Sequence, residues 1–107
     1  MKNYNLGEFE ELVLLVVEAL DGEGYGVNTQ QKLLENSAKN VSLSAVHVAL
    51  KRLSDKGFVK SKVGGVTEER GGRRKRFYTI TGLGRKAIDA QYELRNALYH
   101  QIPKLSH

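Results

Sequence analysis

Apolar residues from about residue 8 to residue 21 recur at three- and four-residue intervals, the spacing of one helical face. They are Phe9, Val13, Val16 and Leu20. Within this segment residues 12–17 are apolar without interruption, which a buried strand would also show, but the whole segment is too long for a typical strand. We therefore expect a helix. A helix that is apolar on every side must be buried on every side, so the pattern also indicates a partner chain.

Two more helices are predicted before the middle of the chain. A weaker apolar pattern indicates a helix over residues 26–36, and residues 36–40 have the composition of a loop. A third helix is expected from Leu43 to about Lys56, with Ser42 as its N-cap and Gly57 as its C-terminal stop. The residues that its core face presents are Leu43, Val46, Leu50 and Leu53.

Two strands and a last helix follow. Residues 58–63 and 75–81 are predicted as strands, and residues 64–72 between them are rich in turn-forming glycine. Thr81 can cap a last helix over about residues 83–101, shortly before a proline. This helix carries an apolar stripe several turns long, which a compact three-helix core does not need. We expect the stripe to pack against a second copy of the chain.

Residues of the first and last helices are therefore the candidates for a homodimer interface. They are Leu12, Leu15, Leu83, Ala87, Ala90, Leu94, Leu98 and Ile102.

The order helix, helix, helix, strand, basic loop, strand is that of a winged helix-turn-helix. In this arrangement the third helix enters the major groove of DNA, and the hairpin, or wing, reaches the flanking backbone or minor groove. The predicted fold class is mostly α with a small β-hairpin: a winged helix-turn-helix plus a C-terminal dimerisation helix. We expect residues 1–82 to form the DNA-binding domain and residues 83–107 the dimerisation helix and tail.

Basic residues are concentrated in one third of the chain. The formal net charge of the 107 residues is +5, but residues 51–86 hold twelve bases and three acids, a net charge of +9. Residues 1–50 hold three bases and seven acids, a net charge of −4. Such a distribution produces a directional field that attracts polyanions and makes their affinity salt-dependent. The same field would also attract an acidic protein, so a protein partner stays open as an alternative to nucleic acid.

The densest basic segment, Glu69 to Arg76, holds four arginines, a lysine and a glycine pair, and an aromatic strand follows it directly. Glycine suits a hairpin tip, and the planar arginine fork suits phosphates and narrow grooves. The outer face of the third helix mixes short polar, small apolar and cationic residues, which suits base edges, thymine methyls and phosphates. A solvated charge run, and a structural role for His47 on the flank of that helix, are the alternatives. The candidate DNA-binding residues are Ser42, Ser44, Ala45, His47, Val48, Lys51, Arg52, Lys60, Lys62, Arg70, Arg73, Arg74, Lys75 and Arg76.

The second hypothesis is an enzyme, but the sequence offers few of the residue patterns that catalysis needs. The chain has no cysteine, and its three histidines, His47, His100 and His107, lack metal-ligand spacing. The glycine pair lacks the pattern of a phosphate-binding loop. We therefore predict no enzymatic activity, no metal and no cofactor. Absent cysteine fits a reducing cytosol, and neither a membrane-length apolar run nor a signal-like start occurs, so we expect a cytoplasmic protein that does not enter membranes.

Five short motifs occur in a fixed order over roughly residues 6–90. They are Leu6-Gly7-Glu8-Phe9-Glu10, Tyr25-Gly26, Leu50-Lys51-Arg52-Leu53, Lys56-Gly57-Phe58-Val59, and Arg70-Gly71-Gly72-Arg73-Arg74-Lys75-Arg76-Phe77-Tyr78 with Thr79-Ile80-Thr81 and Gly84. Together they resemble the PadR family of bacterial transcriptional regulators, on its short branch with a single C-terminal helix.

The resemblance implies a winged-helix homodimer, joined through the C-terminal helix, that binds a pseudo-palindromic operator in double-stranded DNA and usually represses. Ser44 and His47 stand where many relatives have glycine and tyrosine, so base contacts are not carried over from the family. A small-molecule effector is compatible with the resemblance, but the sequence does not identify one. Without tryptophan, an aromatic drug pore is not expected. The alternative is a winged-helix module for protein–protein interaction without specific DNA binding.

Overall fold

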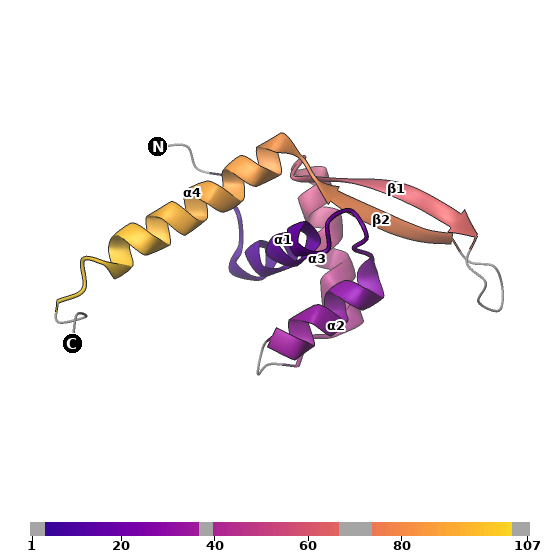
Figure 1. Ribbon diagram of the computed structural model, residues 1–107, viewed down its shortest axis with the longest axis horizontal. Helices are drawn as coiled ribbons and strands as arrows, with labels where there is room; N and C mark the ends of the chain where they lie inside the picture. Colours follow the sequence, from indigo (N-terminus) through magenta and orange to yellow (C-terminus); the bar gives the residue numbers. More distant parts are fainter. Residues whose placement is uncertain (1–3, 37–39, 67–73, 104–107) are drawn as a thin grey trace.

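The computed structural model describes residues 4–36, 40–66 and 74–103, which form four helices and a two-stranded antiparallel sheet (Figure 1). This confirms the predicted fold class and element order. The helices and strands are α1 (Glu8–Ala19), α2 (Gly26–Asn36), α3 (Leu43–Asp55), β1 (Val59–Val66), β2 (Arg74–Ile80) and α4 (Gly82–Tyr99).

Two helix starts follow the predicted capping chemistry. The Ser42 hydroxyl accepts a hydrogen bond from the Ala45 backbone N–H at 3.1 Å, and the Thr81 hydroxyl accepts one from the Gly84 N–H at 3.0 Å. Each bond satisfies one of the backbone donors that the first turn of a helix leaves unpaired. Local sequence thus sets where α3 and α4 begin.

The hairpin is longer than the sequence predicts. The sequence places Gly64 in the tip, but it lies within β1, whose register pairs Val59 with Ile80 and Lys62 with Phe77 before shifting between Val63 and Val66. The Phe77 ring occupies the space into which a side chain at Gly64 would point. Here glycine serves close packing within a strand rather than a turn.

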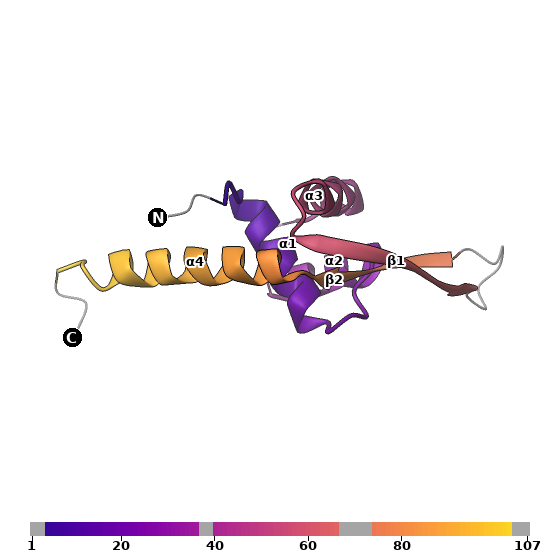
Figure 2. The same ribbon diagram turned by 90° about the horizontal axis from the view of Figure 1, so that it is seen from above.

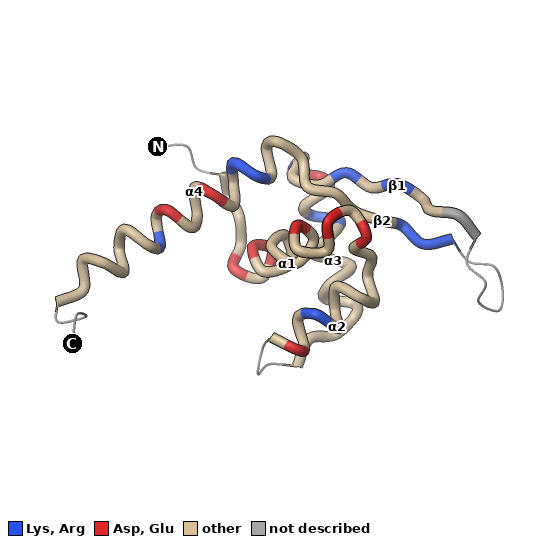
Figure 3. Tube along the Cα trace, viewed as in Figure 1, with Lys and Arg blue, Asp and Glu red and all other residues tan. Residues whose placement is uncertain are grey.

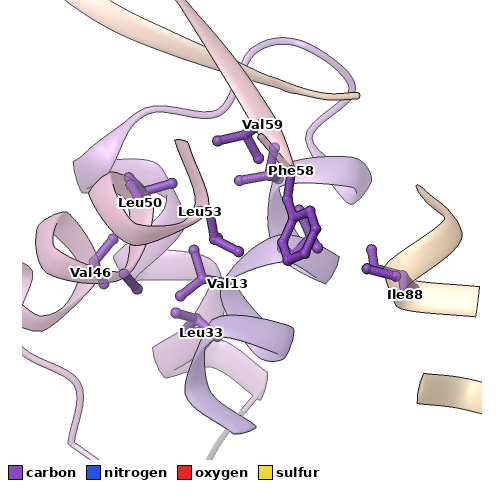
Figure 4. Packing of buried hydrophobic residues seen from close by; sticks show 12 residues of the cluster. Val13, Leu33, Val46, Leu50, Leu53, Phe58, Val59 and Ile88 are labelled. Carbon is purple, nitrogen blue, oxygen red and sulfur yellow. The ribbon is translucent and has the colours of Figure 1, made fainter. Parts of the chain in front are cut away.

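The core lies between α1, α2, α3, the start of the hairpin and the start of α4 (Figure 4). Val13, Leu14 and Val17 of α1 are almost completely buried, together with Leu50 and Leu53 of α3. On the same helix α1, however, Leu12 and Leu15 are 43% and 42% exposed. Residues 12–17 of α1 are therefore apolar on every side of the helix, as predicted, and the chain's own core leaves Leu12 and Leu15 uncovered.

A salt bridge joins the beginning of α1 to the end of α3. The Lys56 ammonium lies 2.5 Å from the Glu10 carboxylate and also donates to the Asn5 carbonyl at 2.7 Å. Burial of Glu10 acts to raise its pKa, but the hydrogen bonds from Lys56 and the Gly7 N–H and the nearby positive charge outweigh it, so the pKa lies below its ordinary value. This pair helps to hold α3 in place on α1.

The hairpin and α4 extend in opposite directions from the three-helix unit (Figures 1 and 2), and the molecule measures 56 × 29 × 20 Å. The first turns of α4 are held by Ala87 and Ile88, which are buried in the core. Two ion pairs join α4 to α1: Arg85 in the first turn pairs with Glu18, and Arg95 farther along lies 3.1 Å from Glu11. The half of α4 after residue 91 is exposed. No helix in the described part of the chain is long and apolar enough to cross a membrane.

Candidate nucleic-acid interface

The outer face of α3 is open to solvent and carries the side chains that the sequence predicts for it. Ser44, Ala45, His47 and Arg52 are exposed, and Val48 is 51% exposed. The Lys51 side chain forms a solvent-exposed pair with Asp55, at 3.3 Å, and such a pair contributes little to stability. Small, apolar and cationic groups therefore stand together on one accessible helix face. Ser42, also in the predicted set, caps the helix.

Lysine and arginine residues lie along both strands of the hairpin (Figure 3). The described residues of β1 and β2 include five bases and no acid. Lys60, Lys62, Arg74 and Arg76 are exposed, and Arg76 donates to the Ser61 hydroxyl at 2.9 Å. The remaining base is Lys75. Two further candidates, Arg70 and Arg73, lie outside the residues that the structure describes.

Lys75 differs from the other hairpin bases because its ammonium faces an aromatic ring of its own chain. It lies 4.3 Å from the centroid of the Tyr25 ring and donates to the Tyr25 hydroxyl at 3.3 Å. Tyr25 also meets the Phe77 ring edge to face, with centroids 5.7 Å apart. Sequence reasoning noted Tyr25 only as part of a motif and missed this contact, because no local pattern links residues 50 positions apart.

His47 packs across the start of α2. A side-chain carbon added at Gly26 would come within 2.5 Å of the His47 ring, so the ring uses the space that glycine leaves free. The imidazole is nevertheless exposed at the surface of α3. The structure thus gives His47 a packing contact and leaves it accessible on α3, and its contact with DNA stays a prediction.

Most residues of the candidate interface for a second copy of the chain are accessible, but one of them is not. Leu94, Leu98 and Ile102 are 39%, 55% and 49% exposed, and Leu12 and Leu15 lie free on α1. Leu83 is 43% exposed and Ala90 is half-buried. Ala87, however, has no exposed surface and belongs to the chain's own core, so its assignment to a partner interface is wrong. The apolar stripe of α4 serves the core in its first turns and is free only beyond them.

A cavity of about 540 Å³ lies beside the start of α3, between α1 and α2. Its lining is mainly apolar, with Phe9, Leu12, Leu33, Val41 and Ala45, and its volume is in the range of small-molecule sites.

Within the described ranges, no group of three or more histidine or acidic side chains could hold a metal ion.

Three packed helices followed by a basic antiparallel hairpin, with an exposed cationic third helix, define a winged helix-turn-helix protein. The sequence model of the transcriptional regulator PadR-like family matches residues 13–90. The chain belongs to this family. No curated protein sequence matches it.

Solved structures share the fold. A PadR family transcription regulator from Clostridium difficile has a TM-score of 0.73 at 21% identity, over 88% of this chain and 93% of that chain. A transcriptional regulator from Clostridium thermocellum has a TM-score of 0.68 at 21% identity, over 92% and 89% of the two chains. Bacillus subtilis PadR, solved in complex with operator DNA, has a TM-score of 0.64 at 17% identity, over 89% of this chain and 60% of that chain.

Proposed function

We propose that this protein is a sequence-specific DNA-binding regulator that binds a pseudo-palindromic operator as a homodimer and represses transcription. Residues 1–82 would bind DNA, and residues 83–107 would join the two protomers. The observation that carries the proposal is the basic surface formed by the exposed face of α3 and the hairpin, whose described strands hold five bases and no acid.

Each element would have a separate role at the operator. The accessible Ser44, His47, Val48 and Lys51 side chains of α3 would meet base edges and thymine methyls in the major groove. Arg74 and Arg76 would contact phosphates or enter a flanking minor groove. Phosphate contacts supply affinity on every sequence, so discrimination between sequences is assigned to α3 and not to the hairpin.

Dimerisation would follow from the uncovered apolar surface. Leu12 and Leu15 on α1 and Leu94 and Leu98 on α4 are exposed in the single chain, and burying them against a second copy is favourable. A two-fold dimer presents two α3 helices, so the expected operator has two related half-sites about one helical turn, roughly 10 base pairs, apart. Repression is the sign of regulation that the family resemblance implies. Such a regulator would act in the cytoplasm and would not be an enzyme.

The second candidate function is a winged-helix module that binds only proteins. The exposed Val48 in the middle of the α3 face favours it, since an apolar side chain there could equally fit a protein groove. The surrounding Lys51 and Arg52 favour DNA.

Selection of bound duplexes from a random DNA pool, with sequencing of the bound fraction, tests the proposal. We expect one motif with internal two-fold symmetry to be enriched over successive rounds. Uniform recovery of all sequences, or no recovery at low salt, where phosphate contacts are strongest, would overturn specific DNA binding and favour the protein-binding module.

A further inference from the structure

The segment between α1 and α2 touches both parts of the basic surface. The Gly24 carbonyl accepts a hydrogen bond from the Tyr78 N–H of β2 at 2.8 Å and so adds a short bridge to the edge of the hairpin. The next residue, Tyr25, contacts the hairpin through its side chain, and the His47 ring of α3 occupies the space where a side chain at Gly26 would lie. Three consecutive residues therefore connect the hairpin with the exposed helix.

Tyr25 makes its hairpin contacts on one face of β2. Lys75 and Phe77 are two positions apart and so point to the same side of the strand, where both are half-buried. The Phe77 ring meets Tyr25 at an interplanar angle of 81°, and the Lys75 ammonium lies over the Tyr25 ring. Edge-to-face pairs and cation–π contacts are directional, so they restrain orientation as well as distance.

The Tyr25 backbone is itself held. Its N–H donates to the Asn28 side-chain carbonyl at 2.8 Å, and the Asn28 amide donates to the Glu23 carbonyl at 3.0 Å. The ring therefore projects from an anchored helix start. Because Tyr25 is fixed to the start of α2, its contacts with the hairpin can hold the hairpin in a set position relative to α2.

We propose that Tyr25 is a positioning residue that fixes the hairpin relative to α3, and that Lys75 acts through Tyr25 rather than as a phosphate contact. The inference rests on the proposed DNA-binding function for its consequence at the operator. A hairpin held at a set angle places Arg74 and Arg76 on the flanking backbone without an ordering cost on binding. We call the contacts of Tyr25 with Lys75 and Phe77 the brace. Without the brace, those arginines no longer reach the phosphates although their charges remain.

The first test needs no DNA. The chain has no cysteine, so cysteines introduced in place of the exposed Val48 on α3 and Lys62 on β1 can carry spin labels site-specifically. Labelled protein is diluted with unlabelled protein, and the distance distribution between the labels is measured by pulsed electron resonance. We expect a narrow distribution in the parent, a broader one in Tyr25→Leu, and no broadening in the control Tyr92→Leu, which changes a 66% exposed tyrosine on α4.

An unbroadened distribution in folded Tyr25→Leu would overturn the brace. If Tyr25→Leu fails to fold, Lys75→Met provides the same test at a half-exposed position, with broadening again expected and an unchanged width again contradicting the proposal. The spin-label measurement tests the brace even if the protein binds no DNA. Failure to bind DNA would contradict only the proposed function.

The second test measures the slope of log affinity against log salt on duplex DNA. Tyr25→Leu removes no charge, yet we expect it to flatten the slope, because the hairpin no longer holds its arginines against the phosphates. We expect Lys75→Met to have no further effect once Tyr25→Leu is present. A slope reduced by about 0.9 on Lys75→Met in both backgrounds would instead identify Lys75 as a direct phosphate contact.

Discussion

Replacing Leu94 and Leu98 by Asp should convert the proposed dimer into monomers and weaken operator binding by roughly 10²- to 10⁴-fold, the gain usually obtained by linking two binding units. Both leucines are exposed in the single chain and lie on the free half of α4. A dimer of the variant would have to bury unpaired carboxylates, which is strongly unfavourable. Sedimentation at micromolar concentration measures the mass, and a fluorescence titration measures the affinity.

The matched control places two carboxylates on the opposite side of the same helix. Tyr92→Asp with Asn96→Asp changes exposed residues that lie about half a turn away from the leucine stripe. This variant should remain a dimer with nearly unchanged affinity. A wild-type protein that sediments only at 12.0 kDa, or a proven monomer that keeps full affinity, would contradict the homodimer.

Replacing Arg74 and Arg76 by Ala should weaken binding to all duplexes by a similar factor and leave the order of preference among sequences unchanged. Both side chains are exposed on the hairpin, and phosphate contacts carry no sequence information. The slope of log affinity against log salt should flatten by about 0.9 for each phosphate that the variant no longer neutralises, thus by up to about 1.8 in the double variant.

Lys86→Ala, compared with the single variants Arg74→Ala and Arg76→Ala, is the control for charge alone, since it removes one exposed positive charge on α4, away from the hairpin. Its salt slope should stay close to that of the wild type. An altered sequence preference with an unchanged slope in the Arg74/Arg76 variant would reverse the assignment and make the hairpin the element that reads bases.

The parts of the fold set by local chemistry could be predicted from the sequence. Ser42 and Thr81 cap α3 and α4 as expected, because a cap needs only a hydroxyl and the backbone of the next turn. The prediction that Gly64 lies in the hairpin tip is wrong because the role of this glycine depends on the Phe77 ring across the strand. Contacts between strands are not visible in the residues around one position.

The same limit explains the two differences at the candidate site. Ala87 lies on the apolar stripe of α4, but only the packed structure shows where that stripe leaves the core. Lys75 has the same charge as its neighbours, and only the fold brings Tyr25 beneath it. The composition and the order of the predicted helices and strands therefore indicated a basic winged helix. Tertiary contacts decide which basic side chains face solvent and which pack against the protein itself.

Methylation interference on a selected duplex tests the central claim most directly, because guanine is methylated in the major groove and adenine in the minor groove. We expect guanine methylation to block binding in two clusters about one helical turn apart, one for each α3 helix. Adenine methylation should interfere only at the outer flanks, where the hairpins lie. Interference confined to the minor groove, or a single cluster of guanines, would contradict a dimer that reads two major-groove half-sites.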